Sequence, residues 1–249
     1  LTTEAVARFQ EKHGMKGHGV ADPETLKLIE EGKIDTTPLI THRFKLENID
    51  EAYKKVAETM AHRPVVIRTL DIGADKQLPY LGLAEEENPA LGMRAIRICL
   101  ARREIFKTQL RAILRASALG RLAVMLPMIV SPKEVEASRA LLSECMEELR
   151  AEGKAFDREL EFGIMIETPA AALRARELAE QVDFFSVGTN DLLQYTLAAD
   201  RQNPLLAQLC EENAEPVLRL IGEAADAIHA TGGWIGVCGE VAADLRLTQ

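Results

Sequence analysis

Residues 184–201 read Phe-Phe-Ser-Val-Gly-Thr-Asn-Asp-Leu-Leu-Gln-Tyr-Thr-Leu-Ala-Ala-Asp-Arg, and this stretch indicates the fold class. An apolar run over 182–187 is typical of a buried strand, and it stops where the chain turns at Gly188. Parallel α/β proteins place their chemistry at the carboxyl ends of such strands. Asp191 suits Mg²⁺, Asn190 can donate to a phosphate oxygen, and Arg201 adds a fork of donors. The stretch therefore predicts a site for an anion held through a metal ion.

Strand and helix patterns alternate along the chain from about residue 64 onward. This alternation predicts parallel βα units, which fit either a (β/α)₈ barrel or an open doubly wound sheet. Polar residues follow several of the strands, and their convergence favours the barrel. Five strands do not close a barrel, so the missing strands would come from residues 1–60, from sequence beyond residue 249, or from nowhere. The predicted strands are 65–70, 122–128 with a continuation to 130, 160–166, 182–187 and 234–238, and the predicted helices are 91–117, 132–150, 170–181 and stretches up to about 230.

Composition narrows the class of protein. The formal net charge of −9 argues against general nucleic-acid binding, which favours basic surfaces. None of the four cysteines forms a CxxC pair, so neither a zinc site nor a dense disulfide framework is predicted. This usage fits a reducing cytosol, and we expect a cytoplasmic protein. We find neither a signal peptide nor an apolar run of transmembrane length, so we expect no membrane partner.

Glu167 ends the apolar strand 164–166 and precedes Thr168-Pro169. It could be a solvated carboxylate in a βα turn. Alternatively, Glu167 and Asp191 are paired Mg²⁺ ligands from neighbouring strands, since Mg²⁺ takes one or two carboxylates and completes its shell with substrate oxygens and water.

Two arginines are candidates for binding an anion. Arg68 ends an apolar strand and must be paired or serve an anion, and an ion pair with Asp71 or Asp75 is the alternative. Arg94 lies near a predicted helix entrance marked by Asn88-Pro89, where backbone amides favour an anion, although it could be an ordinary surface arginine.

Cys238 follows the last predicted strand and precedes Gly239-Glu240. A lone cysteine there is often a small core residue. In a βα turn that faces a cleft it could instead be a proton donor or an oxidisable thiol.

Together these segments resemble one family. The region from about residue 51 to 249 resembles the C-terminal, phosphoenolpyruvate-binding domain of enzyme I of the bacterial sugar phosphotransferase system. The stretches that carry the resemblance are Val-Ile-Arg-Thr-Leu-Asp-Ile-Gly-Ala-Asp-Lys (66–76), Glu-Asn-Pro-Ala-Leu-Gly-Met-Arg-Ala-Ile-Arg (87–97), Gln-Leu-Arg-Ala-Ile-Leu-Arg-Ala-Ser (109–117), Met-Leu-Pro-Met-Ile (125–129), Ile-Glu-Thr-Pro-Ala-Ala (166–171), the opening stretch and Val-Cys-Gly-Glu (237–240).

The resemblance implies a (β/α)₈ TIM barrel of the phosphoenolpyruvate/pyruvate type, and against the family's pattern we expect this barrel to be incomplete at both ends. The barrel would bind phosphoenolpyruvate with Mg²⁺ and pass the phosphoryl group to a protein histidine, leaving pyruvate. It implies that Glu167 and Asp191 are the metal ligands and that Cys238 is the acid that protonates the enolate carbon. Arg68, Arg94 and Arg201 would hold phosphate and carboxylate, and Asn190 would donate to the substrate.

The resemblance also implies partners. These are a histidine-bearing phosphocarrier domain or protein, whose acceptor motif we do not find here, and a second copy in a homodimer. Pyruvate phosphate dikinase and phosphoenolpyruvate synthase share the barrel, but residues 194–201 resemble enzyme I more. A non-catalytic chimeric scaffold is a further alternative.

The first 50 residues differ from the rest. Residues 1–33 resemble a small helical peptidoglycan-binding module, and residues 38–55 resemble the C-terminal region of medium-chain zinc alcohol dehydrogenases. We therefore expect two domains, a mostly helical segment of uncertain origin at 1–50 and the barrel domain at 51–249. Helices over 2–13, 23–31 and 48–61 and a short strand over 40–44 are predicted there.

Overall fold

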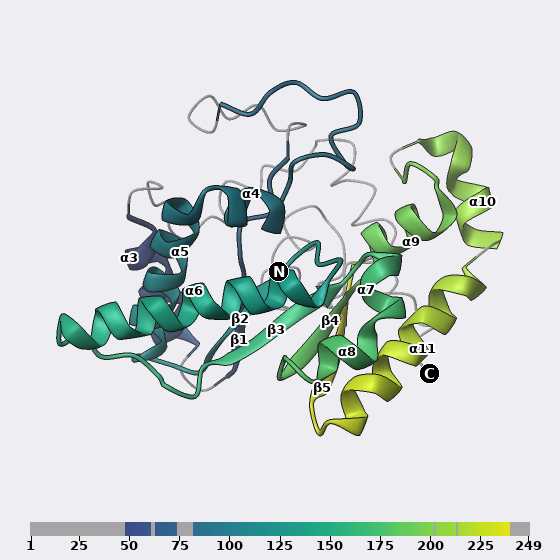
Figure 1. The fold of residues 1–249 in the computed structure, drawn as a ribbon. Helices are drawn as coiled ribbons and strands as arrows, with labels where there is room; N and C mark the ends of the chain where they lie inside the picture. Colours follow the sequence, from purple (N-terminus) through teal and green to yellow (C-terminus); the bar gives the residue numbers. More distant parts are fainter. Residues whose placement is uncertain (1–47, 61–62, 74–81, 202, 213, 240–249) are drawn as a thin grey trace, which may run out of the picture. The chain divides into compact units, whose positions relative to one another are not determined.

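A computed structural model describes residues 48–60, 63–73, 82–201, 203–212 and 214–239 (Figure 1). The chain divides into two compact units, 1–47 and 48–249, and the described residues belong to the second. The elements predicted at 2–13, 23–31 and 40–44, and Asp75, lie outside the described residues.

In the described part of the chain, five parallel strands form one sheet, and their spatial order is their order in the chain. Strand order therefore never reverses, as it does at the switch point of a doubly wound sheet. Each right-handed connection leads to the neighbouring strand on the same side of the sheet, so the connecting helices lie on one face. The sheet is therefore a half-barrel with the helices outside (Figure 1). The expected barrel-type α/β fold is confirmed, and the alternative of a doubly wound sheet is wrong. The strands are β1 (Val65–Arg68), β2 (Leu122–Leu126), β3 (Glu161–Ile166), β4 (Phe184–Gly188) and β5 (Trp234–Cys238).

The helices cover the outer face of the half-barrel. Figure 1 shows α6, α8 and α11 lying along that face of the sheet. Helix α6 begins as the sequence predicts, with Pro132 in its first turn and a capping box between Ser131 and Glu134. The helices are α3 (Ile49–Thr59), α4 (Ile96–Ala101), α5 (Arg103–Ser117), α6 (Pro132–Ala151), α7 (Pro169–Leu173), α8 (Ala175–Ala179), α9 (Thr189–Leu197), α10 (Ala207–Glu212) and α11 (Glu215–Ala230), with a 3₁₀ turn η3 (Pro204–Leu206).

The structure corrects three predicted elements. The single helix predicted over 91–117 begins only at Ile96, after Ala95 with a φ of 51°, and is broken at Arg102, whose φ and ψ are −119° and 66°. The helix predicted over 170–181 is broken at Arg174. Strand β2 ends at Leu126, before Pro127 and a left-handed Met128, so it does not continue to 130. Periodicity reports which residues are apolar and does not detect such single-residue breaks.

Alternating residues of the strands face two different cores. The larger core lies between the outer face and the helices and includes Val124, Ile164 and Phe185. A smaller cluster of Ala123, Met125, Met165 and Phe184 lies on the inner face, with Cys238 packed against it. Because alternate side chains of a strand point to opposite faces, Cys238 lies on the inner face of the half-barrel.

Gly163 on β3 leaves room for an aromatic ring on the inner face. Phe184 is buried, stacks on Trp234 with ring centroids 4.3 Å apart, and would lie 2.4 Å from a Cβ at Gly163. We expect Gly163→Ala to lower the free energy of unfolding by about 1–3 kcal/mol, because the ring has to move.

Urea denaturation measures this effect, and Gly222→Ala is the matched control. Gly222 lies within α11, and a Cβ there would meet nothing within 4 Å. That control should raise stability by about 0.5–1 kcal/mol through helix propensity. A Gly163→Ala protein as stable as the wild type would contradict the packing described for the inner face.

Candidate functional site

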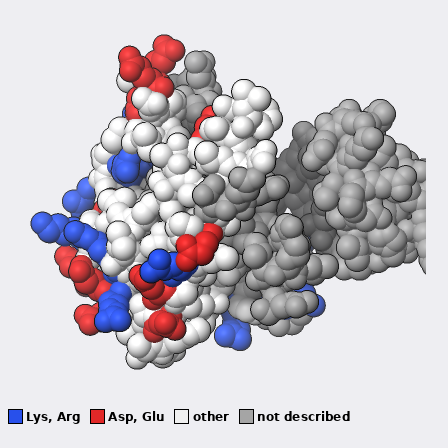
Figure 2. Space-filling model, turned by 90° about the vertical axis from the view of Figure 1, so that its right-hand side faces the viewer, with Lys and Arg blue, Asp and Glu red and all other residues white. Residues whose placement is uncertain are grey.

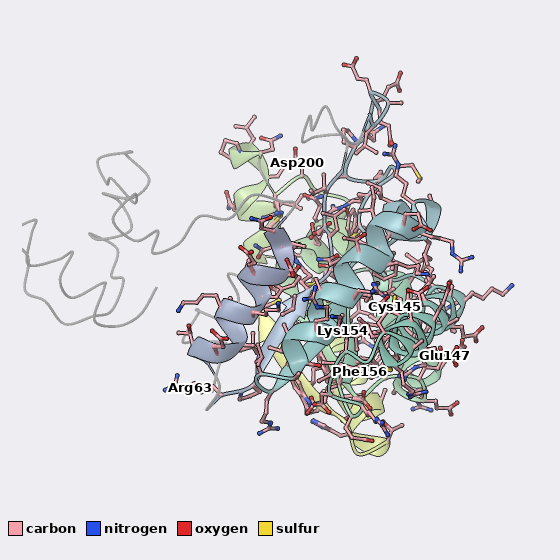
Figure 3. The ribbon with its side chains drawn as sticks, turned by 90° about the vertical axis from the view of Figure 1, so that its left-hand side faces the viewer. Arg63, Cys145, Glu147, Lys154, Phe156 and Asp200 are labelled. Carbon is pink, nitrogen blue, oxygen red and sulfur yellow. The ribbon has the colours of Figure 1, made fainter. Side chains whose placement is uncertain are left out.

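The carboxyl ends of the strands gather polar side chains at one end of the half-barrel. β1 ends at Arg68, β3 is followed by Glu167, β4 by Asn190 and Asp191 in the first turn of α9, and β5 ends at Cys238. Figure 3 shows Asp200, which follows α9, and Arg63, which precedes β1, well apart, in the upper and the lower part of the view. The polar residues thus share the end that carries function in barrels of this type.

Glu167 is a buried carboxyl group. Its side chain is 1% exposed, and Oε1 accepts a hydrogen bond of 2.6 Å from the backbone N–H of Met128. Burial, with a smaller contribution from the negative charges of Asp191 and Asp71, raises the pKa of Glu167 to about 7, although the Met128 hydrogen bond and Arg68 lower it. The carboxyl group is therefore set among like charges and lacks a sufficient counter-charge.

Arg94 joins two carboxylates at this end. Its Nη2 donates to both oxygens of Asp71, at 3.0 and 3.2 Å, and lies 3.8 Å from Oδ2 of Asp191. Burial alone lowers the pKa of Arg94, but Asp71, followed by Tyr195 and Asp191, raises it above its ordinary value. The alternative of an ordinary surface arginine is therefore wrong for Arg94. It lies in the segment before α4, where the corrected helix boundary places it outside the helix.

Arg68 has an ion-pair partner and also an exposed side that could bind an anion. Its Nη1 lies 3.6 Å from Asp71, so the predicted ion pair with Asp71 is confirmed. Its side chain is nevertheless 47% exposed and lies against Sδ of Met165 on the inner face. An arginine that is paired on one side and open on the other can still meet an anion.

Cys238 and Asn190 are brought together by the turn after β5. The Cys238 thiol donates to the carbonyl of Val187 at 3.2 Å, and the hydroxyl of Thr189 donates to the Cys238 carbonyl at 3.0 Å. Gly239 has a φ of 98°, and a Cβ there would lie 3.0 Å from Oδ1 of Asn190. This close approach requires glycine at 239.

The structure does not bring Arg201 into the network that Arg94 forms with Asp71 and Asp191. Its side chain is exposed beyond the end of α9, and its backbone N–H donates to the side chain of Gln194.

The donor set fits Mg²⁺ in kind. Glu167 and Asp191 offer hard oxygens, and a bound cation would favour the charged form of Glu167, whose pKa is raised chiefly by burial. Within the described ranges no group of three or more His, Cys, Asp or Glu side chains could hold a metal ion. Two carboxylates are enough for Mg²⁺, which takes its remaining oxygens from water and substrate.

Two partners of Arg94, Asp71 and Tyr195, are not among the site residues that the sequence predicts. Asp71 was considered only as an ion-pair partner for Arg68, and its second partner, Arg94, follows 23 residues later. Tyr195 accepts a 3.0 Å hydrogen bond from Nη1 of Arg94. A signal for Tyr195 was present, because it lies four residues after Asp191 and so shares its face of α9.

Comparison with known proteins defines the family of this chain. The sequence profile of the PEP-utilising enzymes, in their PEP-binding domain, matches residues 8–249. The chain belongs to this family.

Several curated proteins are at least 50% identical to most of this chain, and they share one name. The chain is 55% identical over 197 residues to the phosphoenolpyruvate-protein phosphotransferase of Haemophilus influenzae, an alignment that covers 79% of this chain and 34% of that protein. The proteins of that name from Geobacillus stearothermophilus and Bacillus subtilis are 50% and 51% identical, with 86% and 78% of this chain and 37% and 34% of the relative covered. The chain thus spans about a third of the length of these relatives.

Solved structures with a similar arrangement include a citrate lyase from Burkholderia xenovorans, with a TM-score of 0.43, 22% identity and coverage of 53% of this chain and 40% of that one. A HpcH/HpaI aldolase/citrate lyase family protein from Burkholderia cenocepacia has a TM-score of 0.42, 13% identity and coverage of 78% and 77%.

The surface and the helices give two further findings. Lys and Arg side chains lie interspersed with Asp and Glu side chains on the face drawn in Figure 2. Among the described residues, no helix is both long enough and apolar enough to cross a bilayer.

Proposed function

We propose that this chain binds phosphoenolpyruvate with Mg²⁺ and forms the part of a phosphoenolpyruvate-protein phosphotransferase that carries the phosphoryl donor. The observation that carries the proposal is a group of charged side chains at the carboxyl ends of the half-barrel strands. Arg94 pairs with Asp71 and lies near Asp191, Arg68 pairs with Asp71, and the buried Glu167 senses the charges of Asp191, Asp71 and Arg68. Carboxylates suited to a divalent cation, beside the half-exposed Arg68 and the more buried Arg94, match a ligand that has both phosphate and carboxylate groups.

Each site residue has a proposed role. Glu167 and Asp191 hold Mg²⁺, Arg68, Arg94 and Arg201 hold the phosphate and carboxylate, and the Asn190 amide donates to the substrate. When bound, the ion supplies positive charge that neutralises the substrate oxygens.

The proposed reaction transfers one phosphoryl group. A histidine nitrogen of the acceptor forms a bond to phosphorus while the bond from phosphorus to the enolate oxygen breaks. The Cys238 thiol then gives its proton to the enolate carbon, which yields pyruvate. The Cys238 thiol already lies at the end of β5 next to Ser186, whose hydroxyl donates to Sγ at 3.7 Å.

Further proposals concern the whole protein. We infer that the acceptor histidine belongs to a separate domain or phosphocarrier protein, that two copies associate, and that the reaction starts sugar uptake in the cytoplasm. We also infer that residues 51–249 are the barrel domain and that 1–50 are a distinct segment, although the family profile already begins to match at residue 8. The shared name of the relatives favours this function over a dikinase, a synthase or an inert scaffold.

Calorimetry with the full chain tests the proposed function. We expect phosphoenolpyruvate to bind at millimolar concentration or below when Mg²⁺ is present, and to bind at least tenfold more weakly in EDTA. Asp191→Ala should abolish the Mg²⁺-dependent part, because one of the two carboxylate ligands is lost.

Asp226→Ala is the matched control for this prediction. Asp226 is an exposed carboxylate on α11 and should leave binding unchanged. Absence of binding at millimolar ligand, or equal binding by wild type and Asp191→Ala, would contradict the proposal. If binding is found, a histidine-bearing domain from a relative should receive the phosphoryl group and release pyruvate.

A further inference from the structure

The hydroxyl group of Tyr195 connects two segments that form the candidate site. It accepts a 3.0 Å hydrogen bond from Nη1 of Arg94 and donates a 2.5 Å hydrogen bond to the carbonyl of Ala90. A neutral phenol has one proton to donate and lone pairs to accept, so both bonds can form together. Burial raises the pKa of Tyr195, and the hydroxyl therefore keeps its proton at neutral pH. The segment before α4 is thereby joined to α9, which carries Asp191.

The segment around Arg94 has little regular structure and depends on side chains for its shape. Glu86 accepts the backbone N–H of Met93 at 2.9 Å, and Nη1 of Arg97 donates to the carbonyls of Leu91 and Gly92 at 2.7 Å each. These two anchors come from the segment itself or from the adjacent helix α4. Tyr195 follows this segment by more than 100 positions in the chain. Its hydrogen bonds hold the segment to α9, which carries Asp191, one of the proposed metal ligands.

Backbone strain next to Arg94 makes that anchor important. Ala95 is fully buried and has a φ of 51° with a ψ of −124°, a backbone conformation that is strained for a residue other than glycine. Its N–H is bonded to the carbonyl of Ile72, so the strained residue is held near Asp71. Such strain persists only where surrounding contacts over-determine the conformation, and Tyr195 provides two of these contacts.

Asp71 and Tyr195 occupy different nitrogens of the same guanidinium. Asp71 takes both of its hydrogen bonds from Nη2, and Tyr195 takes its bond from Nη1. A planar guanidinium held on two nitrogens has its orientation set, and not only its position. The remaining 3.8 Å approach of Nη2 to Asp191 follows from this orientation.

We propose that Tyr195 is a positioning residue, which orients Arg94 and its segment against α9 so that the arginine meets the substrate anion beside the metal ligands. This inference rests on the proposed function and assigns it a residue that the sequence did not. Tyr195 acts through Arg94, and its hydroxyl group alone carries the effect.

Tyr195→Phe tests the inference because it removes only the hydroxyl oxygen. In the full chain, phosphoenolpyruvate affinity in the presence of Mg²⁺ should fall about tenfold, as for the loss of a hydrogen bond to a charged group. In an Arg94→Lys background the same change should alter affinity less than twofold, because lysine has no planar fork to orient. Equal losses in both backgrounds, or no loss in the wild type, would overturn the inference.

Tyr53→Phe is the matched control. The Tyr53 hydroxyl accepts a 2.9 Å hydrogen bond from Gln109 between α3 and α5, and Tyr53 is partly buried, as Tyr195 is. Its loss should lower stability but leave phosphoenolpyruvate affinity within twofold of the wild type. An affinity loss in Tyr53→Phe as large as that in Tyr195→Phe would mean that Tyr195 has only a structural role.

A ligand-free measurement separates this inference from the proposed function. Amide hydrogen exchange over residues 88–95 should become at least tenfold faster in Tyr195→Phe, while exchange in α6 stays unchanged. If the wild type fails to bind phosphoenolpyruvate but this exchange accelerates, the proposed function is wrong and the anchoring role of Tyr195 stands. If the exchange is unchanged, the inference is wrong whether or not phosphoenolpyruvate binds.

Discussion

Replacing Arg94 by alanine is expected to lower the free energy of unfolding by about 3–5 kcal/mol, because it leaves a nearly buried carboxylate without its main partner. Asp71 is 8% exposed and receives both of its charge-assisted hydrogen bonds from Nη2 of Arg94. Arg68, 3.6 Å from Asp71, compensates only in part because its own side chain is half exposed. Urea denaturation at pH 7 measures the loss.

Two further substitutions make the Arg94 prediction specific. Arg103→Ala removes an exposed arginine that lies 3.5 Å from Glu144, and it should cost less than about 1 kcal/mol. Arg94→Lys keeps the charge but lacks the planar fork, so its loss should be intermediate. If Arg94→Ala and Arg103→Ala lose equal stability, the buried network around Asp71 does not contribute as described.

Replacing Glu167 by glutamine should have the second large effect, on the pH dependence of stability. The pKa of Glu167 in the folded protein is raised to about 7 from an ordinary value of 4.5, chiefly by burial. A raised folded-state pKa gives stability that is fully present below pH 4.5 and is lost as the pH rises through 7. The shift corresponds to about 3 kcal/mol, so the metal-free wild type should lose about that much from this group between pH 4.5 and pH 8.

Glu167→Gln removes this ionisation and keeps an oxygen that can accept the Met128 bond. In EDTA, the variant should therefore have a flatter stability profile and exceed the wild type at pH 8. Its Mg²⁺-dependent affinity for phosphoenolpyruvate should fall at least tenfold, because an amide is a weaker ligand than a carboxylate for a hard cation. Gain of stability with loss of binding is expected where a strained site serves function.

Urea denaturation between pH 4.5 and pH 8 checks the first part, and calorimetry checks the second. Glu136→Gln, at an exposed position of α6, is the control and should keep the pH profile of the wild type. A Glu167→Gln protein with the slope of the wild type would show that Glu167 titrates as an ordinary carboxyl group.

Much of the fold was predictable because each strand is a short apolar run of similar length between helical patterns. All five strands were located, and the polar residues that follow them were recognised as one site because parallel strands end at the same edge. The helix that was predicted as continuous over 91–117 was wrong because its breaks at Ala95 and Arg102 are backbone conformations without a glycine or proline to mark them.

The choice between a barrel and a doubly wound sheet depended on the order of the strands in space. Both folds are built from the same βα units, so local patterns do not distinguish them. The parallel register from β1 to β5, in chain order, decides the question, since each pairing joins residues far apart in sequence.

The sequence by itself determined which groups are available for the proposed site, because the carboxylates that suit Mg²⁺ and the guanidinium groups that suit an anion are single side chains. Only the tertiary structure decided how they are joined. It places Asp71 on Nη2 of Arg94 and Tyr195 on Nη1, raises the pKa of Glu167, and leaves Arg201 exposed. The physical reason is that hydrogen bonding and burial act over a few ångströms in space, between residues that chain order separates by up to about 100 positions.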